Sequence, residues 1–163
     1  MRANFAYFLI FFMVLVLDSC IHKPVYPSQP VIAYKDFIRY GNPANPTTAE
    51  LVVSFTDNEG DISLPNKEPS LCMVYFYWDT TGVDHWSAYD MHSGIGTFDT
   101  LKFCLWVPQV LPNGDSSEPM KGLIYAKLDP FIKLHNRIKY VVYLKDQAGH
   151  TSDTIHTPAF TFP

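Results

Sequence analysis

The sequence is poor in charged residues, and its positive charges do not gather into a basic stripe. Twelve lysines and arginines stand against 16 aspartates and glutamates in 163 residues, a formal net charge of −4. Nucleic-acid-binding proteins usually carry a basic patch that neutralises phosphates. We therefore expect no nucleic-acid partner for this chain.

The sequence also lacks the short motifs that mark many enzymes. It has no Gly-x-Ser-x-Gly, His-Glu-x-x-His, phosphate-binding loop or Cys-x-x-Cys. One group of side chains could bind a catalytic metal: Asp84, His85, Asp90 and His92. A working zinc site needs three or four ligands oriented by further hydrogen bonds, and this spacing does not supply them. We expect a non-catalytic protein, with a small metal-dependent enzyme around His85 and His92 as the alternative.

Cysteine is scarce, with three residues in the whole chain. Two of them, Cys72 and Cys104, lie within apolar runs that have the composition of β-strands. An oxidising compartment would allow them to form a disulfide. Alternatively, both could be free thiols in the core, because a buried cysteine commonly serves as a small hydrophobic residue. The distance between their Cα atoms decides between these alternatives, and a sequence does not contain it.

No apolar run is long enough to cross a bilayer comfortably. The longest extends from Phe5 to Leu17 and follows a single basic residue, Arg2. A membrane-spanning helix needs about 20 apolar residues, whereas the apolar region of a signal peptide has about 7 to 15. The run therefore predicts an export signal.

The segment Leu17-Asp18-Ser19-Cys20 directly follows that apolar run. With a leucine three residues before the cysteine and a small residue next to it, this segment resembles the lipobox of bacterial lipoproteins. The resemblance implies that residues 1–19 are a signal peptide and that Cys20 carries the lipid. It further implies a lipid-anchored protein of the cell envelope, in the outer membrane, with the side that it faces left open.

Residues 20–30 predict a tether between the anchor and the domain. Pro24, Pro27 and Pro30 recur at every third position. Proline fixes φ and has no N–H to donate to a strand ladder, so this segment should be extended. The remaining residues, 31–163, are enough for one domain with a hydrophobic core.

Between Val31 and the end of the chain, no stretch has a helical period of apolar residues. Short runs rich in β-branched and aromatic residues alternate with turns rich in Gly, Pro, Asn and Asp. This pattern predicts an antiparallel β-sandwich of about seven or eight strands. The expected strands are 31–40, 49–56, 71–79, 97–107, 122–128, 138–145 and 153–162, with a short extra strand at 86–91; the clearest expected loops are 41–46 and 112–117.

Two polar turns carry a family resemblance. The turn after the penultimate strand contains Asp146, Ala148, Gly149, His150 and Ser152. This motif, together with the run Phe-Thr-Asp-Asn-Glu-Gly-Asp-Ile at 55–62, resembles bacterial immunoglobulin-like and fibronectin-type-III-like domains. The resemblance implies a sandwich of that type, which serves as a binding or structural domain in many unrelated proteins.

The turn at 55–62 is the most polar point after the tether. It places three carboxylates, Asp57, Glu59 and Asp61, on alternate residues around a glycine. Calcium accepts six to eight oxygen ligands and tolerates loop geometry. The turn therefore predicts a weak Ca²⁺ site, to which Asp146 or Asp153 could contribute if the terminal hairpin folds back to this end. The alternative is a solvated acidic turn with no cofactor.

Aromatic residues are abundant around the third expected strand. Alternation along a strand places Tyr75 and Tyr77 on one face and Phe76 and Trp78 on the other. If the tyrosine face is exposed beside Trp86 and Tyr89, these residues form a platform for a sugar ring or a protein partner, which predicts a carbohydrate-binding accessory lipoprotein. The alternative is that they belong to the core.

Overall fold

The structure is a computed structural model that describes residues 24–80, 85–91, 100–108 and 118–163. The expected signal peptide and Cys20 lie outside the described residues, as do Asp84 and His92 of the expected metal group. Within the described part of the chain, no helix is long and apolar enough to cross a membrane.

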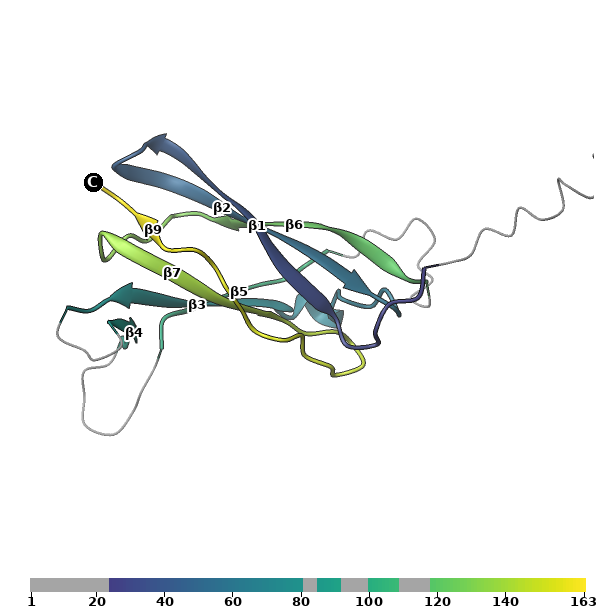
Figure 1. The fold of residues 1–163 in the computed structure, drawn as a ribbon. Coiled ribbons are helices and arrows are strands. Elements are labelled where there is room, and N and C mark those ends of the chain that lie inside the picture. The colour runs from purple at the N-terminus through teal and green to yellow at the C-terminus, as the bar shows by residue number, and fades with distance from the viewer. Residues whose placement is uncertain (1–23, 81–84, 92–99, 109–117) are drawn as a thin grey trace, which may run out of the picture.

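Two antiparallel sheets pack face to face (Figure 1). One sheet has the order β1-β2-β6 and the other β4-β3-β7-β8, with β5 also paired to β3 and β9 to β7. The expected antiparallel β-sandwich is confirmed. The strands are β1 (Val31–Asn42), β2 (Asn45–Asp57), β3 (Leu71–Trp78), β4 (Trp86–Ala88), β5 (Lys102–Leu105), β6 (Met120–Leu128), β7 (Arg137–Leu144), β8 (Ile155–His156) and β9 (Phe160–Thr161).

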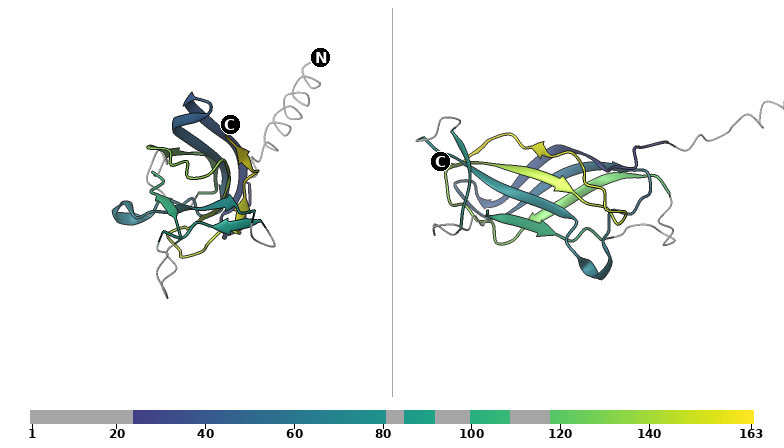
Figure 2. Two further views of the ribbon diagram at one scale, coloured as in Figure 1. Left: turned by 90° about the vertical axis from the view of Figure 1, so that its left-hand side faces the viewer. Right: turned by 90° about the horizontal axis from the view of Figure 1, so that it is seen from below.

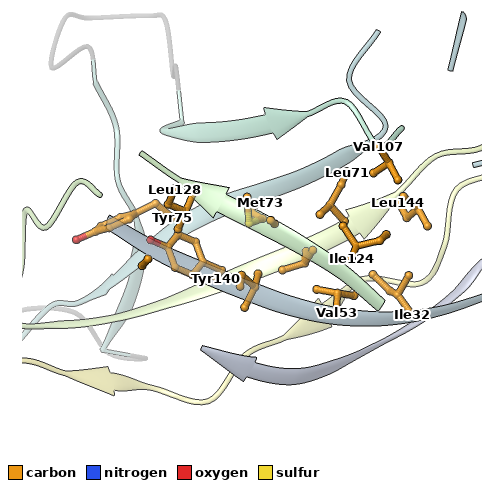
Figure 3. Packing of buried hydrophobic residues seen from close by; sticks show 14 of the residues in the cluster. Ile32, Val53, Leu71, Met73, Tyr75, Val107, Ile124, Leu128, Tyr140 and Leu144 are labelled. Atoms are coloured by element: carbon orange, nitrogen blue, oxygen red, sulfur yellow. The ribbon is translucent and has the colours of Figure 1, made fainter. Parts of the chain in front are cut away.

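Alternating side chains of the two sheets form the core. In β7, Ile138, Tyr140, Val142 and Leu144 are buried, and the residues between them are half-buried. These residues meet those of β2, β3 and β6 in one continuous cluster (Figure 3). Each fully buried side chain of this size contributes about 1.5–3 kcal/mol, so this cluster is what holds the sheets together.

The loop expected at 41–46 is wrong. β1 continues to Asn42 and β2 begins at Asn45, so that only Pro43 and Ala44 form the turn. The Asn42 side chain stabilises the turn, because its Oδ1 accepts the N–H of Ala44 at 2.9 Å. Residues that are typical of turns, such as Gly41 and Asn42, therefore belong to the paired strands here.

The prediction of a single strand at 153–162 is also wrong, because this segment contains two short strands, β8 and β9. β8 pairs with Val141 and Val142, and β9 pairs with the start of β7. Between them, Pro158 has no N–H to donate to a ladder. The chain remains tied to β7 through Thr157, whose N–H donates to the Tyr140 carbonyl at 2.9 Å.

The strand ladder aligns Cys72 of β3 with Cys104 of β5. The two residues are joined by a disulfide, with their Cα atoms 4.1 Å apart. The bond lies within one sheet, at the edge that β5 adds to β3. Figure 2 shows the two layers end-on and from below.

Candidate metal centre

Two turns meet at one end of the sandwich, which we call the acidic end and define by Asp57, Glu59, Asp61, Asp146 and His150. Asp57 ends β2, Glu59 and Asp61 lie in the turn that follows it, and Asp146 and His150 lie in the turn after β7. Hydrogen bonds join the turns: the Ala148 N–H donates to Asp61 Oδ2 at 3.1 Å across 87 residues of sequence. The Gln147 N–H donates to the Asp61 carbonyl at 3.0 Å. The two turns therefore form one unit.

The first turn is tightly constrained. Asp57 Oδ2 accepts the N–H of Asp61 at 3.0 Å, which closes the loop upon itself. Gly60 has φ +66°, and a Cβ at this position would lie 2.5 Å from the Glu118 carbonyl oxygen. Only glycine fits both the conformation and the space. The sequence of the turn thus directs both aspartates inward.

The second turn is closed by an aspartate that binds its own loop. Asp146 Oδ1 accepts the His150 N–H at 2.7 Å, and Asp146 Oδ2 lies 2.9 Å from His150 Nδ1. The same ring nitrogen lies 4.0 Å from Glu59 Oε2 of the first turn. His150 is thus the one cationic group among the described residues that is paired with this cluster.

Three of the four carboxylates of the acidic end are buried, and Glu59 is half-buried. Asp57, Asp61 and Asp146 are 0 %, 8 % and 2 % exposed. Among the described residues, no hydrogen bond reaches Asp57 Oδ1, Asp61 Oδ1 or Glu59 Oε2. A buried polar atom without a partner costs about 1–3 kcal/mol, and a charged one costs more. The cluster therefore lacks a partner that its oxygen atoms require.

The pKa values of the acidic end follow from this burial. Burial raises the pKa of Asp57; the N–H of Asp61 opposes that shift, and the negative charge on Asp61 adds to it. Burial also raises the pKa of Asp61, and the charge on Asp146 raises it further. The hydrogen bond and charge of Asp146 raise the pKa of His150. The charge on each of these side chains thus affects the pKa of its neighbours.

Two overlapping groups of side chains have the spacing of metal ligands. One is Asp57, Asp61 and Asp146, and the other is Glu59, Asp146 and His150; within each group, one ligand atom per residue lies within 4.8 Å of the others. The fold brings Asp146 to the three expected acids, whereas Asp153 is exposed and belongs to neither group. Sequence reasoning did not assign His150 to the site. Its signal was its position four residues after Asp146, within the same turn.

The expected aromatic platform is wrong, because the tyrosine face points inward. Tyr75 is fully buried, and Tyr77 and Tyr89 pack against the core. The Tyr75 ring makes edge contacts with Tyr89 and Tyr140, at centroid distances of 6.1 and 5.9 Å. Trp86 pairs with Trp78 of the opposite face. Tyr75, Tyr77, Trp86 and Tyr89 therefore do not form one surface.

The outer face of β3 carries the other aromatic residues, and cations cover them. Trp78 and Trp86 contact each other edge-on with centroids 5.2 Å apart. The Arg137 guanidinium lies 4.2 Å from the Trp78 ring centroid, and Lys139 Nζ lies 4.5 Å from that of Trp86. Such cation–π contacts contribute about 0.5–1 kcal/mol at exposed sites. These rings thus already have partners within the protein.

Two residues of the expected enzyme site, His85 and Asp90, lie within the described part of the chain, and they do not come together as metal ligands. The His85 ring stacks on Trp78 at 4.8 Å, and its Nδ1 lies 3.2 Å from the Asp79 carbonyl oxygen. Asp90 forms an isolated bridge with Thr100. Neither His85 nor Asp90 belongs to a metal-ligating group within the described residues.

An apolar groove runs beside β6, the edge strand of the first sheet. Three large side chains of the groove are exposed: Leu123 at 49 %, Tyr125 at 57 % and Trp106 at 38 %. Edge strands present unpaired backbone groups, and extended peptides bind such edges beside apolar pockets. The groove thus has the features of a peptide-binding surface.

The chain matches no protein-family model, no curated protein and no solved structure.

Proposed function

We propose that this protein is a lipid-anchored, non-catalytic module of the cell envelope, held at the membrane through Cys20. The observation that carries the proposal is the lipobox-like segment Leu17-Asp18-Ser19-Cys20 directly after an apolar run. The described chain before β1 also contacts the domain at one end. The Tyr26 N–H donates to Asn58 Oδ1 at 3.2 Å, and Gln29 Nε2 donates to the Thr151 carbonyl at 2.6 Å. Pro30 is buried. The segment before the sandwich is thus bound to the acidic end, and a lipid on Cys20 would hold that end toward the membrane.

The order of the strands supports an immunoglobulin-like or fibronectin-like type. The first, second and sixth strands share one sheet, while the third and seventh pair at the centre of the other. In immunoglobulin-like sandwiches, strands A, B and E share one sheet and strands C, F and G the other. If β4 and β5 are taken together as the edge next to strand C, β6 corresponds to strand E. Sandwiches of this type commonly serve as adhesion, linking or binding modules.

Acylation at Cys20 is tested by replacing its thiol. We expect Cys20→Ser to release the protein from the membrane fraction or leave it unprocessed, because stable attachment requires the acyl chains. The matched control is the pair Cys72→Ser and Cys104→Ser, which removes the other two cysteines and should leave membrane attachment unchanged. Unchanged fractionation of Cys20→Ser, together with a mature mass that contains no lipid, would contradict the anchor.

The groove beside β6 favours a binding role over a purely structural one. A photo-crosslinking amino acid at Tyr125, in the groove, should form adducts with another polypeptide in intact cells. Tyr40, which is 43 % exposed on β1, is the matched control. The binding role would be rejected if position 125 formed no adduct, or formed only those that position 40 forms.

A further inference from the structure

We propose that the acidic end binds one Ca²⁺ ion, with Asp57, Asp61 and Asp146 as its central ligands and Glu59 at its outer side. This inference does not depend on the lipid anchor. Asp57 Oδ1 and Asp61 Oδ1 are buried without a hydrogen-bond partner in the described structure. Ligand atoms of these two residues and of Asp146 lie within 4.8 Å of one another. A cation placed among these three carboxylates would supply the opposite charge that buried carboxylates need.

A solvated acidic turn does not fit this geometry. Acids in a solvated turn point outward and separate, because water screens their mutual repulsion. Here Asp57 is fully buried at the end of β2, and Asp61 is held by the second turn through Ala148. The carboxylates therefore cannot move apart without breaking the bonds that join the two turns. A buried charge needs an opposite charge close to it.

The protein's own cation does not meet that need. His150 Nδ1 contacts Asp146 Oδ2 at 2.9 Å and lies 4.0 Å from Glu59 Oε2. Even when protonated, it supplies one positive charge against the four carboxylates of the acidic end. It also leaves the free oxygens of Asp57 and Asp61 without a hydrogen bond. A divalent ion supplies twice that charge where the carboxylates of Asp57, Asp61 and Asp146 converge.

The chemistry of the donors favours calcium. All central ligands are carboxylate oxygens in turns, and Ca²⁺ accepts six to eight such oxygens with irregular geometry, the rest coming from carbonyl groups and water. Mg²⁺ requires near-octahedral geometry and retains several waters, which suits a buried site poorly. Zn²⁺ prefers nitrogen and sulfur ligands, and the acidic end offers one imidazole, whose Nδ1 is already directed at Asp146.

The same ion would connect the domain to the segment before it. Asn58, which accepts the Tyr26 N–H, lies between the ligands Asp57 and Glu59 in the first turn. Calcium that orders this turn would also hold Asn58 in place. We therefore expect calcium to protect residues 26–30 from proteolysis.

The test is a calcium titration of the full-length mature protein, purified in detergent and stripped with a chelator. Isothermal titration with CaCl₂ should show one site with a dissociation constant of about 10⁻⁴ to 10⁻³ M, the range of extracellular calcium modules. At ten times that concentration, the midpoint of thermal unfolding should rise by about 3–6 °C. Parallel titrations use MgCl₂ and ZnCl₂.

The variant Asp57→Asn with Asp61→Asn should lose at least about tenfold in calcium affinity, because it removes two of the central charges. The matched control, Asp129→Asn with Asp153→Asn, removes two exposed carboxylates and should bind as the wild type does. If the first variant fails to fold, Asp146→Asn is titrated in its place. The site is disproved if the wild type binds no calcium at millimolar concentration or if the ligand variant binds unchanged. Tighter binding of Mg²⁺ or Zn²⁺ than of Ca²⁺ would overturn the assignment to calcium.

Discussion

The two ends of the sandwich both bury polar groups, but they differ in the charge of those groups. We call the opposite end the aromatic end and define it by Tyr75, Tyr77, Tyr89, His135 and Tyr140. The Tyr75 and Tyr140 hydroxyl groups and the His135 imidazole are neutral in the folded protein. The buried groups of the acidic end are carboxyl groups, whose negative charges would repel one another. A protein tolerates a neutral buried group with an imperfect partner far better than it tolerates a buried charge.

Individual contacts show which partners the polar groups of the aromatic end have. Tyr75 Oη accepts the Leu134 N–H at 3.3 Å, and the His135 ring stacks on Tyr77 with centroids 4.0 Å apart. Burial raises the pKa of Tyr75 and Tyr140 and lowers that of His135, so all three stay uncharged near neutral pH. Tyr140 Oη has no partner among the described residues. Protonation state alone resolves the electrostatics here, whereas the acidic end brings several ionisable carboxyl groups together.

The largest expected loss of stability comes from a substitution at the aromatic end. Tyr140→Ala should lower the free energy of unfolding by about 3–5 kcal/mol, because it opens a cavity where β7 meets β3. Tyr140→Phe is the matched control: it keeps the ring and removes the hydroxyl that lacks a partner, so it should be neutral or stabilising. Denaturant unfolding measures both changes. If Tyr140→Phe lowered the free energy of unfolding by several kcal/mol, the Tyr140 hydroxyl would have a hydrogen-bond partner in the folded protein.

The next effect concerns the cross-link between β3 and β5. Replacing Cys72 and Cys104 together by serine should cost about 3–4 kcal/mol, the loop-closure contribution expected for a separation of 32 residues. The loss should be the same with calcium and with chelator, because neither cysteine belongs to the acidic end. Unfolding under both conditions tests this. A loss that depends on calcium would mean that the two parts of the molecule are coupled.

The sequence predicted the acids of the first turn but not the whole cluster. Asp57, Glu59 and Asp61 are neighbours in the chain, so their proximity is a local property. The approach of Asp146 and His150 depends on β2 and β7, strands of different sheets, ending at the same end of the sandwich. The packing of two sheets is not encoded in any short stretch. The sequence therefore offered Asp146 only on condition that the terminal hairpin folds back, and His150 was not assigned to the site.

The orientation of β3 was not predictable for a different physical reason. Both faces of this strand are apolar and aromatic, with Tyr75 and Tyr77 on one and Phe76 and Trp78 on the other. A strand reveals its inward face only when the other face is polar. The evidence lay outside the strand: Arg137 and Lys139 on β7 cover the outer tryptophans, and those contacts become visible only when the register is known.

A smaller effect should distinguish the acidic end from the aromatic end directly. In the presence of chelator, Asp61→Asn should raise the free energy of unfolding by about 1 kcal/mol, because it removes a charge that burial and Asp146 both disfavour. The amide oxygen can still accept the Ala148 N–H. With saturating calcium the order should reverse, and the wild type should be the more stable. Thermal melts under the two conditions measure this crossover; a variant less stable than the wild type in chelator would refute like-charge strain at this end.

The smallest expected effect is a difference in pH dependence between the two histidines. His135 has a folded-state pKa below 6.5, so the unfolded chain takes up its proton first and stability is lost as the pH falls through 6.5. His150 has a folded-state pKa above 6.5, so its contribution is fully present below 6.5 and is lost as the pH rises through the folded value. The two ends should therefore respond to the same pH change with opposite sign.

Single variants separate these two contributions. In chelator, His135→Phe keeps the stacking on Tyr77 and should reduce the loss of stability below pH 6.5, because no proton can be taken up there. His150→Gln should reduce the loss of stability above pH 6.5, because the charged pair with Asp146 is absent at every pH. Each variant serves as the control for the other, since both remove one imidazole. Melting midpoints measured in steps from pH 5 to 8 test the assignment. The difference in midpoint between each variant and the wild type, plotted against pH, should slope in opposite directions for the two variants. Slopes of the same sign would mean that burial at the aromatic end and the Asp146 contact at the acidic end do not govern the protonation of these two histidines.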